Sequence, residues 1–231
     1  MRVVVLTGAG VSAESGLPTF RDADGLWEGH RPEEVATPEA FESDPDLVQR
    51  FYDARRAALG SVEPNAAHHA LTRLEQRLGD DFFLVTQNID DLHQRAGSRR
   101  MMPMHGRLRS AYCVHCGERS HWLGTLADRP PCPACGMPTL RPDVVWFGEV
   151  PHGLLKIEKH LEIADIFVSI GTSGVVYPAA GFAQVARSAG ALTLELNLEP
   201  SVGSVDFDEA RHGPATELVP AWVDELLAAL G

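Results

Sequence analysis

The chain has 231 residues, of which 44% are hydrophobic and 23% charged, so it suits one α/β domain with an inserted lobe or two small domains. Its net charge of −12 works against binding to nucleic acid or to an anionic membrane, and no apolar run reaches membrane-spanning length. A strand is expected from Arg2, which leaves no room for a signal peptide, so we expect a cytoplasmic protein with reduced cysteines.

Strands and helices alternate along the predicted fold. The apolar runs expected to form strands are continuous rather than alternating, which is typical of a parallel sheet buried on both faces. We therefore predict an α/β fold with a Rossmann-like, doubly wound parallel sheet. The expected strands are 2–7, 82–86, 101–104, 144–146, 166–170, 192–196 and 204–207; the expected helices include 45–59, 65–78 and 214–230.

The first strand runs into a glycine-rich turn with the pattern Gly-x-Gly-x-x-Ala over residues 8–13. Such glycines let the backbone approach a pyrophosphate at a helix N-terminus, although the pattern alone also fits a simple tight turn. In a standard dinucleotide fold an acidic residue follows at a strand end about 20 residues on. Here Asp22, Asp24 and Glu28 fall in a loop and the second strand arrives late, which argues against a hydride-transferring dehydrogenase.

Two insertions interrupt the α/β alternation, and one carries all four cysteines. Two Cys-x-x-Cys pairs separated by fifteen residues fit a structural zinc site, because four thiolates fill a tetrahedral coordination sphere. The expected ligands are Cys113, Cys116, Cys132 and Cys135, with His115 and His121 as bystanders. We predict a sheet domain from 1–29, 82–108 and 141–231, and a small domain from a helical insertion, 30–81, and a zinc ribbon, 109–140.

Polar residues follow several strands at the edge where open α/β sheets bind ligands. They are Gln87, Asn88 and Asp90 after the second strand, His105 after the third, Thr172 and Ser173 after the fifth, and Asn197 and Glu199 after the sixth. His105 is a residue type that accepts a proton near neutral pH. Asn88 or Asp90 alone would also serve as a helix cap, but the convergence of several strand ends favours a functional cleft.

Several ordered motifs together resemble the sirtuins, the NAD-dependent protein deacylases. They are GAGVSAESGLPTFR, TQNIDDLH, the HG pair, the two Cys-x-x-Cys pairs, VVWFGE and GTS. The match runs from residue 3 to about residue 220, and it implies a Rossmann-like domain and a zinc-containing small domain with NAD and substrate between them.

The resemblance also implies roles for individual residues. His105 would be the general base on the ribose hydroxyls, supported by Asn88 and Asp90, after the acyl-lysine oxygen displaces nicotinamide; zinc would have no chemical role. NAD would contact Gly8, Ala9, Gly10, Ala13, Phe20, Arg21, Trp27, Gln87, Asn88, Ile89, Asp90, Gly171, Thr172, Ser173, Asn197, Leu198, Glu199 and Ala215.

For the protein substrate, the resemblance implies an acyl-lysine peptide that lies in extended form along Val145, Phe147, Gly148 and Val175. Tyr52 and Arg55 look like the pair of the desuccinylase and demalonylase branch of sirtuins. Three positions apart on a helix, they share a face on which a hydroxyl and a guanidinium would hold a carboxylate. The competing interpretation is a solvated, arginine-rich helix with Tyr52 in the core. We expect succinyl-, malonyl- and some acetyl-lysine activity from a monomer.

Three other functions compete with this one. Mono-ADP-ribosylation would use the same NAD site and differ only in its product. A non-catalytic binding module would be expected to lack one of Asn88, Asp90 and His105, and all three are present. A dehydrogenase is opposed by the missing strand-end acid.

Overall fold

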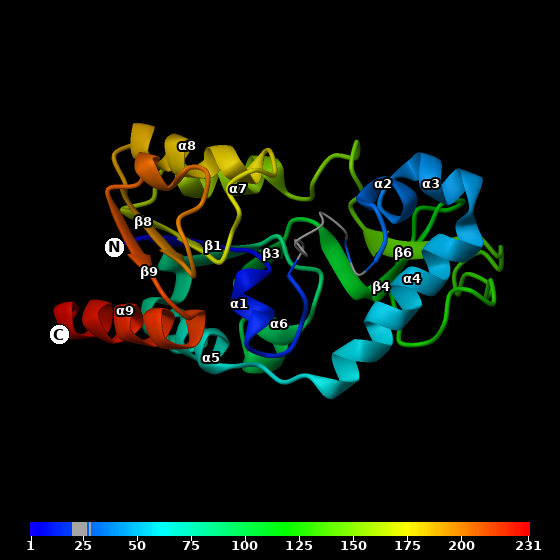
Figure 1. The fold of residues 1–231 in the computed structure, drawn as a ribbon, viewed down its shortest axis with the longest axis horizontal. Coiled ribbons are helices and arrows are strands. Elements are labelled where there is room, and N and C mark those ends of the chain that lie inside the picture. Colours follow the sequence, from blue (N-terminus) through cyan, green and yellow to red (C-terminus); the bar gives the residue numbers. More distant parts are fainter. Residues whose placement is uncertain (20–26, 28) are drawn as a thin grey trace.

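A six-stranded sheet organises the larger lobe of the computed structural model, which describes residues 1–19, 27 and 29–231 (Figure 1). Within the described residues every neighbouring pair of its strands is parallel, in the order β3-β2-β1-β7-β8-β9. The strands β2 and β3 therefore lie on one side of β1, and β7, β8 and β9 lie on the other. This reversal of strand order creates a topological switch point at the carboxyl end of β1. The strands are β1 (Val3–Thr7), β2 (Phe82–Thr86), β3 (Met101–Pro103), β7 (Ile166–Ile170), β8 (Leu192–Asn197) and β9 (Glu209–His212).

Helices cover both faces of this sheet, as the continuous apolar strands require. Val3 and Val5 face a core shared with α5 (Ala66–Leu78) and α9 (Ala215–Ala229), which lie side by side in Figure 1. Val4 and Leu6 face the opposite core, shared with α7 (Leu154–Leu161) and α8 (Phe182–Ser188). The predicted Rossmann-like parallel sheet is therefore confirmed.

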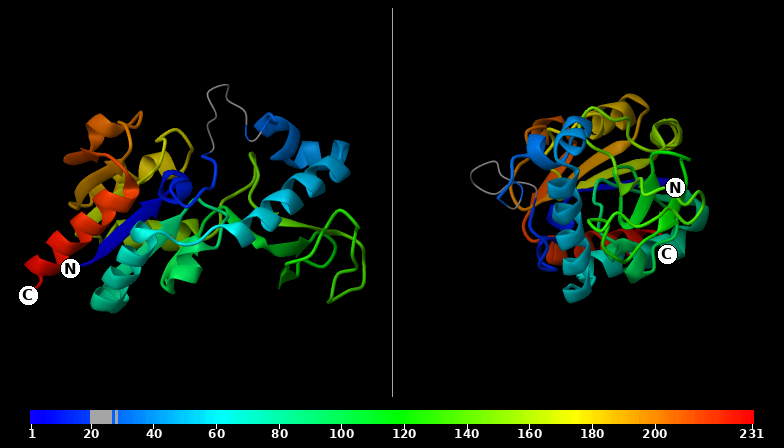
Figure 2. Two further views of the ribbon diagram at one scale, coloured as in Figure 1. Left: turned by 60° about the horizontal axis from the view of Figure 1, so that its bottom comes forward. Right: turned by 90° about the vertical axis from the view of Figure 1, so that its right-hand side faces the viewer.

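The smaller lobe lies at the other end of an elongated molecule, away from both chain termini (Figures 1 and 2). Its antiparallel sheet has the order β5-β4-β6. Residues of this sheet and of the helices of the smaller lobe share one hydrophobic core, which contains Tyr52 and Trp146. The Asp53 carboxylate joins the helical and cysteine-bearing parts by accepting hydrogen bonds from the backbone N–H groups of Leu126 and Ala127. The elements are α2 (Pro32–Val35), α3 (Pro38–Ser43), α4 (Pro45–Ala58), β4 (Gly106–Cys113), β5 (Arg119–His121) and β6 (Leu140–Val144).

The remaining described helices are short and lie at loops. They are α1 (Gly10–Ala13), α6 (Leu92–Ala96) and the 3-10 turns Leu59–Ser61, Gly79–Asp81, Ala179–Gly181 and Ser204–Asp206. No helix in the described part of the chain combines the length and the apolar character needed to cross a membrane.

The predictions of two strands are wrong, because the structure has these strands at other residues. The run 144–146 was expected in the parallel sheet, but the strand is β6, Leu140–Val144, and it pairs antiparallel with β4. The run 204–207 forms a 3-10 turn in which Ser204 donates to the buried Glu195, and the last strand is β9 instead. The domain boundaries stay a prediction; α5 packs into the large-sheet core, which favours placing residues 66–78 with the larger lobe.

Candidate active site

A large cleft opens between the carboxyl edge of the parallel sheet and the smaller lobe. Its volume is about 1010 Å³, which is enough for a dinucleotide and part of a second substrate. Its walls come from the loops after β1, β2, β3, β7 and β8, together with α4 and the segment after β6. These loops meet there because the carboxyl ends of parallel strands share one edge.

The glycine-rich turn after β1 packs directly against the turn after β7. A Cβ atom on Gly10 would lie 2.7 Å from the Cα of Gly171, and one on Gly8 would lie 2.7 Å from the Gly171 carbonyl oxygen. Gly171 has φ +60°, and its own Cβ would lie 2.5 Å from the Val11 nitrogen. The three glycines therefore permit the two loops to touch, a need that the sequence pattern did not reveal. The backbone of these glycines also lines the cleft, which fits a bound pyrophosphate.

A buried polar cluster forms the floor of the cleft between β1 and β2. Ser12 Oγ donates to Asp90 Oδ2 at 3.0 Å and accepts from Asn88 Nδ2 at 3.2 Å. Burial raises the pKa of Asp90, while hydrogen bonds from the Leu92 backbone and from Ser12 lower it. Asp90 also accepts from the Leu92 N–H at 3.0 Å, so it bonds the start of α6 as well as the cluster. Asp90 thus bonds both the polar cluster and the first residue of α6, although the N-cap residue of that helix is Asp91.

His105 lines the cleft directly after β3. Its Nδ1 lies 3.0 Å from the carbonyl oxygen of Gln87, an atom that only accepts hydrogen bonds. Nδ1 therefore carries the proton in the neutral ring and Nε2 holds the free lone pair. Burial lowers the pKa of His105, which keeps the ring neutral and able to take a proton near pH 7.

Tyr52 and Arg55 of α4 lie at the end of the cleft formed by the smaller lobe. Tyr52 is fully buried, and its hydroxyl accepts a hydrogen bond from Trp146 Nε1 at 3.0 Å. Arg55 is 7% exposed, and its guanidinium carbon lies 3.8 Å from the ring centroid of Phe51. Arg55 is therefore buried rather than solvated, whereas Tyr52 belongs to the core of the smaller lobe, as the competing interpretation expected.

Nearly all the other expected site residues also line this cleft. At the β7 and β8 ends, Asn197 Nδ2 donates to the Thr172 carbonyl oxygen at 2.8 Å, which joins the two loops. Val175 is the exception: the chain turns at Gly174, φ +72°, and brings Val176 and Tyr177 to the cleft instead. Phe20 and Arg21 lie outside the described residues. The other lining residues expected from sequence are Ala9, Ala13, Trp27, Ile89, Val145, Phe147, Gly148, Ser173, Leu198, Glu199 and Ala215.

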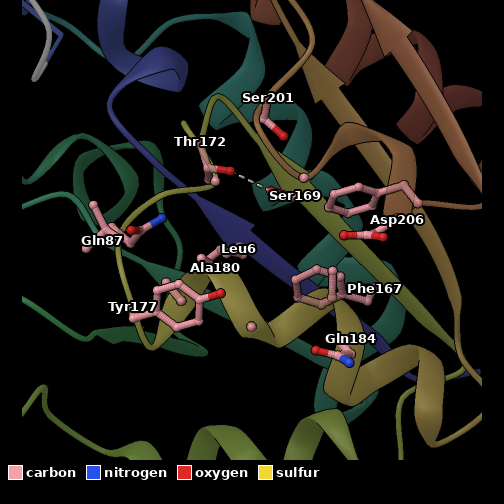
Figure 3. A pocket seen from close by; sticks show the side chains of 17 residues that line it. Leu6, Gln87, Phe167, Ser169, Thr172, Tyr177, Ala180, Gln184, Ser201 and Asp206 are labelled. Atoms are coloured by element: carbon pink, nitrogen blue, oxygen red, sulfur yellow. Dashed lines mark hydrogen bonds between the residues drawn. The ribbon is translucent and has the colours of Figure 1, made fainter.

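A second, smaller cavity of about 100 Å³ adjoins this cleft behind the loop after β7 (Figure 3). Gln87, Thr172 and Tyr177 line both cavities. Inside the small cavity, the hydroxyls of Ser169 and Thr172 are hydrogen bonded to each other at 2.8 Å.

The four cysteines converge at the far end of the smaller lobe. Their sulfur atoms all lie within 4.8 Å of one another, and the Cys113–Cys135 and Cys116–Cys132 pairs are each 3.7 Å apart. Four thiolates about 2.3 Å from a tetrahedral zinc ion would lie about 3.8 Å apart. The cluster therefore fits a structural zinc ion, and it leaves no position for a substrate.

Sequence reasoning assigned no role to two residues that line the cleft, Ser12 and Trp146, or to His68, which contacts the polar cluster. Ser12 links Asn88 to Asp90, and its place inside the glycine-rich motif was an available signal. Trp146 holds the Tyr52 hydroxyl, and its partner lies 94 positions away, so no local pattern indicated it. His68 lies beneath the polar cluster, with Nε2 3.4 Å from Ser12 Oγ.

A model of the Sir2 family matches residues 8–178, about three quarters of the chain. The chain belongs to the Sir2 family. Among its relatives, a Caulobacter vibrioides protein named NAD-dependent protein deacylase is 56% identical over 100% of this chain and 98% of its own. A protein of the same name from Escherichia coli K12 is 55% identical over 99% of this chain and 83% of its own.

Solved structures agree with the assignment to the Sir2 family. A Sir2 homologue in complex with NAD superposes with a TM-score of 0.90 at 40% identity, covering 100% of this chain and 91% of that one. A Sir2 structure with a deacetylated p53 peptide and 3′-O-acetyl ADP-ribose gives a TM-score of 0.85 at 29% identity, covering 97% and 93%.

Proposed function

We propose that this Sir2-family enzyme uses NAD to remove succinyl, malonyl and acetyl groups from protein lysine side chains. The observation that carries the proposal is a single cleft that holds a proton-accepting His105, a glycine-lined loop pair and a buried arginine with a neighbouring tyrosine. Relatives named NAD-dependent protein deacylase, at more than half identity over nearly the whole chain, support the NAD-dependent chemistry. The acyl preference rests on Tyr52 and Arg55.

The residues around the switch point fit NAD. The close-packed loops at Gly8, Gly10 and Gly171 bring backbone rather than side chains to the cleft, as a pyrophosphate requires. We assign the adenosine end to the loops after β8 and before α9, through Asn197, Leu198, Glu199 and Ala215. When bound, NAD supplies an electrophilic ribose carbon and nicotinamide as its leaving group.

His105 is the general base in this proposal. Its Nε2 takes a proton from a ribose hydroxyl, and the Gln87 carbonyl holds the opposite nitrogen and stabilises the ring once it is charged. Asn88, Ser12 and Asp90 offer a fixed set of donors and acceptors at the position proposed for the nicotinamide and ribose. Since these groups are hydrogen bonded to one another before a ligand arrives, they need little reorganisation.

The acyl-lysine peptide would lie along residues 145–148, opposite the loop after Gly174. The N–H groups of Val145 and Phe147 already donate to the carbonyl oxygens of His105 and Ala36, each at 2.9 Å. At these two residues the peptide must therefore form its bonds to the carbonyl side or rely on side-chain contact. Such main-chain recognition reads little sequence, so we expect weak peptide specificity. We further propose that the enzyme acts in the cytoplasm as a monomer and does not bind nucleic acid.

Product analysis by mass spectrometry tests the proposal. The protein would be mixed with NAD and with succinyl-lysine or acetyl-lysine peptides of one sequence, and nicotinamide with O-acyl-ADP-ribose is the expected product pair. Arg55→Met should lower kcat/KM for the succinyl peptide by about 10- to 100-fold, and far more than for the acetyl peptide, because a charge-assisted contact to the carboxylate is lost. Arg50→Met, at an exposed position on the same helix, is the matched control.

Each contrary outcome has its own meaning. Equal losses for the two acyl groups in Arg55→Met would discard the acyl preference and keep the deacylase. Loss of NAD with ADP-ribose attached to the protein would indicate mono-ADP-ribosyl transfer instead. No consumption of NAD would reject both activities.

A further inference from the structure

The hydroxyl group of Tyr52 has its acceptor side occupied. Trp146 Nε1 lies 3.0 Å from the Tyr52 oxygen, and both side chains are almost completely buried. An indole N–H only donates, so the tyrosine oxygen is the acceptor in this bond and its own proton must point elsewhere. Among the described residues no second hydrogen-bond partner of this hydroxyl is found, while Tyr52 lines the cleft.

Burial also fixes the protonation state of this group. It raises the pKa of Tyr52 well above the usual range, although the bond from Trp146 and the charge of Arg55 both act to lower it. The hydroxyl therefore keeps its proton near neutral pH and remains a donor. A buried donor without a partner costs free energy, and a ligand that accepts the bond relieves that cost.

Trp146 is itself held in place from two sides. The guanidinium of Arg141 lies 3.9 Å from the centroid of its indole ring, and Arg141 donates to Glu149 Oε2 at 2.8 Å. The same carboxylate oxygen accepts from the Trp146 backbone N–H at 2.8 Å. Phe41 packs on the ring with centroids 5.2 Å apart. These contacts fix the direction of the indole N–H. They therefore also fix which side of the Tyr52 hydroxyl oxygen accepts the hydrogen bond from Trp146.

We propose that Trp146 is a positioning residue that makes the cleft selective for acyl groups ending in a carboxylate. By occupying the acceptor side of the Tyr52 hydroxyl, it turns the hydroxyl proton toward the acyl chain, in the cleft that Arg55 also lines. A carboxylate accepts both bonds, whereas an acetyl methyl group accepts neither. This inference rests on the proposed acyl preference and adds to it the residue that sets the hydrogen-bond direction.

A double-mutant cycle tests it, because a merely structural Trp146 would not act through Tyr52. The measured quantity is the ratio of kcat/KM for succinyl-lysine to that for acetyl-lysine peptides of one sequence, in which effects common to both substrates cancel. We expect Tyr52→Phe to lower the ratio about 10-fold or more, and Trp146→Phe about 3- to 10-fold. In the Tyr52→Phe background, Trp146→Phe should change the ratio by less than about 2-fold, because no hydroxyl remains to be directed.

Trp122→Phe is the matched control. Its indole N–H also donates within the smaller lobe, to the Thr125 carbonyl oxygen at 3.3 Å, but Trp122 does not line the cleft. Its ratio should stay within about 2-fold of the wild-type ratio. Should Trp146→Phe fail to fold, benzothienylalanine at position 146 keeps the bicyclic shape and removes only the N–H.

The outcomes separate this inference from the function beneath it. If Tyr52→Phe lowers the ratio and Trp146→Phe leaves it unchanged, or lowers it equally in both backgrounds, the positioning role is overturned and the acyl preference stands. If Tyr52→Phe itself leaves the ratio unchanged, the proposed acyl preference fails, and the role of Trp146 fails with it.

Discussion

The Nδ1 atom of His105 lies 3.0 Å from the carbonyl oxygen of Gln87, and this contact decides which nitrogen of the ring can act as a base. Since the carbonyl can only accept, the proton of the neutral imidazole is on Nδ1 and the lone pair is on Nε2. The two residues follow neighbouring strands, β3 and β2, whose pairing is parallel. The sheet therefore sets both the position of the proposed base and its tautomer.

The first prediction concerns the acid limb of the activity profile. Burial lowers the pKa of His105 from its ordinary value of 6.5, and the nearby His152 lowers it further when charged. Only neutral His105 accepts a proton, so kcat/KM should be constant from pH 7 to 8 and should fall on acidification with an apparent pKa below 6.5. His105→Asn should lower kcat by about 10²- to 10⁴-fold, the usual contribution of a general base. His152→Asn should instead move the acid limb to higher pH.

These rates would be measured by nicotinamide release under conditions where the fold is intact at each pH, as checked by circular dichroism. An acid limb above 6.5, or a fully active His105→Asn enzyme, would rule out the assigned base.

The second prediction concerns the contact between the two glycine loops. In Gly10→Ala the new Cβ would lie 2.7 Å from the Gly171 Cα and 2.9 Å from its carbonyl oxygen, both of them backbone atoms that cannot rotate away. Separating the loops should lower the free energy of unfolding by about 1–3 kcal/mol, as overpacking generally does, and should weaken NAD binding at least about 10-fold.

Calorimetric titration with NAD and thermal unfolding would measure the two effects of Gly10→Ala. Gly60→Ala is the control, because a Cβ atom at position 60 would meet nothing within 4 Å. Equal NAD affinity in the Gly10→Ala and Gly60→Ala proteins would show that the loop contact does not shape the NAD site.

The sequence predicted the large sheet well because each of its strands is a short apolar run with clear ends. Residues 82–86 and 166–170 coincide with β2 and β7. It failed at 204–207, where the local composition suits a strand but Ser204 bonds to Glu195 of β8 and the chain turns. It also placed 144–146 in the wrong sheet, since an apolar run does not state its partner.

The site residues likewise separate into features that could be predicted from the sequence and features that could not. Residues after strand ends could be grouped from sequence because parallel strands bring their carboxyl ends to one edge. The links between side chains could not, because they join distant positions: Asn88 to Ser12 across 76 residues, and Trp146 to Tyr52 across 94. Likewise the glycines of the first turn were predicted from their pattern, but their close packing on Gly171 depends on strand order.

The third prediction concerns the cysteine cluster. One zinc ion per chain is expected, and Cys116→Ser should lower zinc content and reduce the free energy of unfolding by several kcal/mol, because metal-binding free energy contributes to folding. Zinc would be quantified by mass spectrometry of the intact native protein, and stability by urea unfolding. His115→Ala is the control, because His115 is exposed beside the cluster and outside the expected ligand set. Full zinc content in Cys116→Ser would show that this thiolate is not a ligand.

The fourth prediction concerns the buried histidine beneath the polar cluster. Burial lowers the pKa of His68 from 6.5 to about 4, so the folded protein holds it neutral, while the unfolded chain takes up a proton below pH 6.5. The contribution of neutral His68 to the free energy of unfolding is fully present above pH 6.5. It is lost as the pH falls toward 4, since the unfolded state then binds more protons than the folded state.

Between pH 7.5 and pH 5, this single group should remove about 2 kcal/mol from the free energy of unfolding. In His68→Gln the drop over the same interval should be smaller by that amount, even though the variant is less stable at pH 7.5 because the contact with Ser12 is altered. His69→Gln, at the exposed neighbouring position, should show a drop only slightly smaller than that of the wild type, because burial is the larger cause of the low pKa of His68 and the charge of His69 the smaller one. Urea unfolding at the two pH values measures all three proteins, and an undiminished drop in His68→Gln would mean that His68 is not held neutral by the fold.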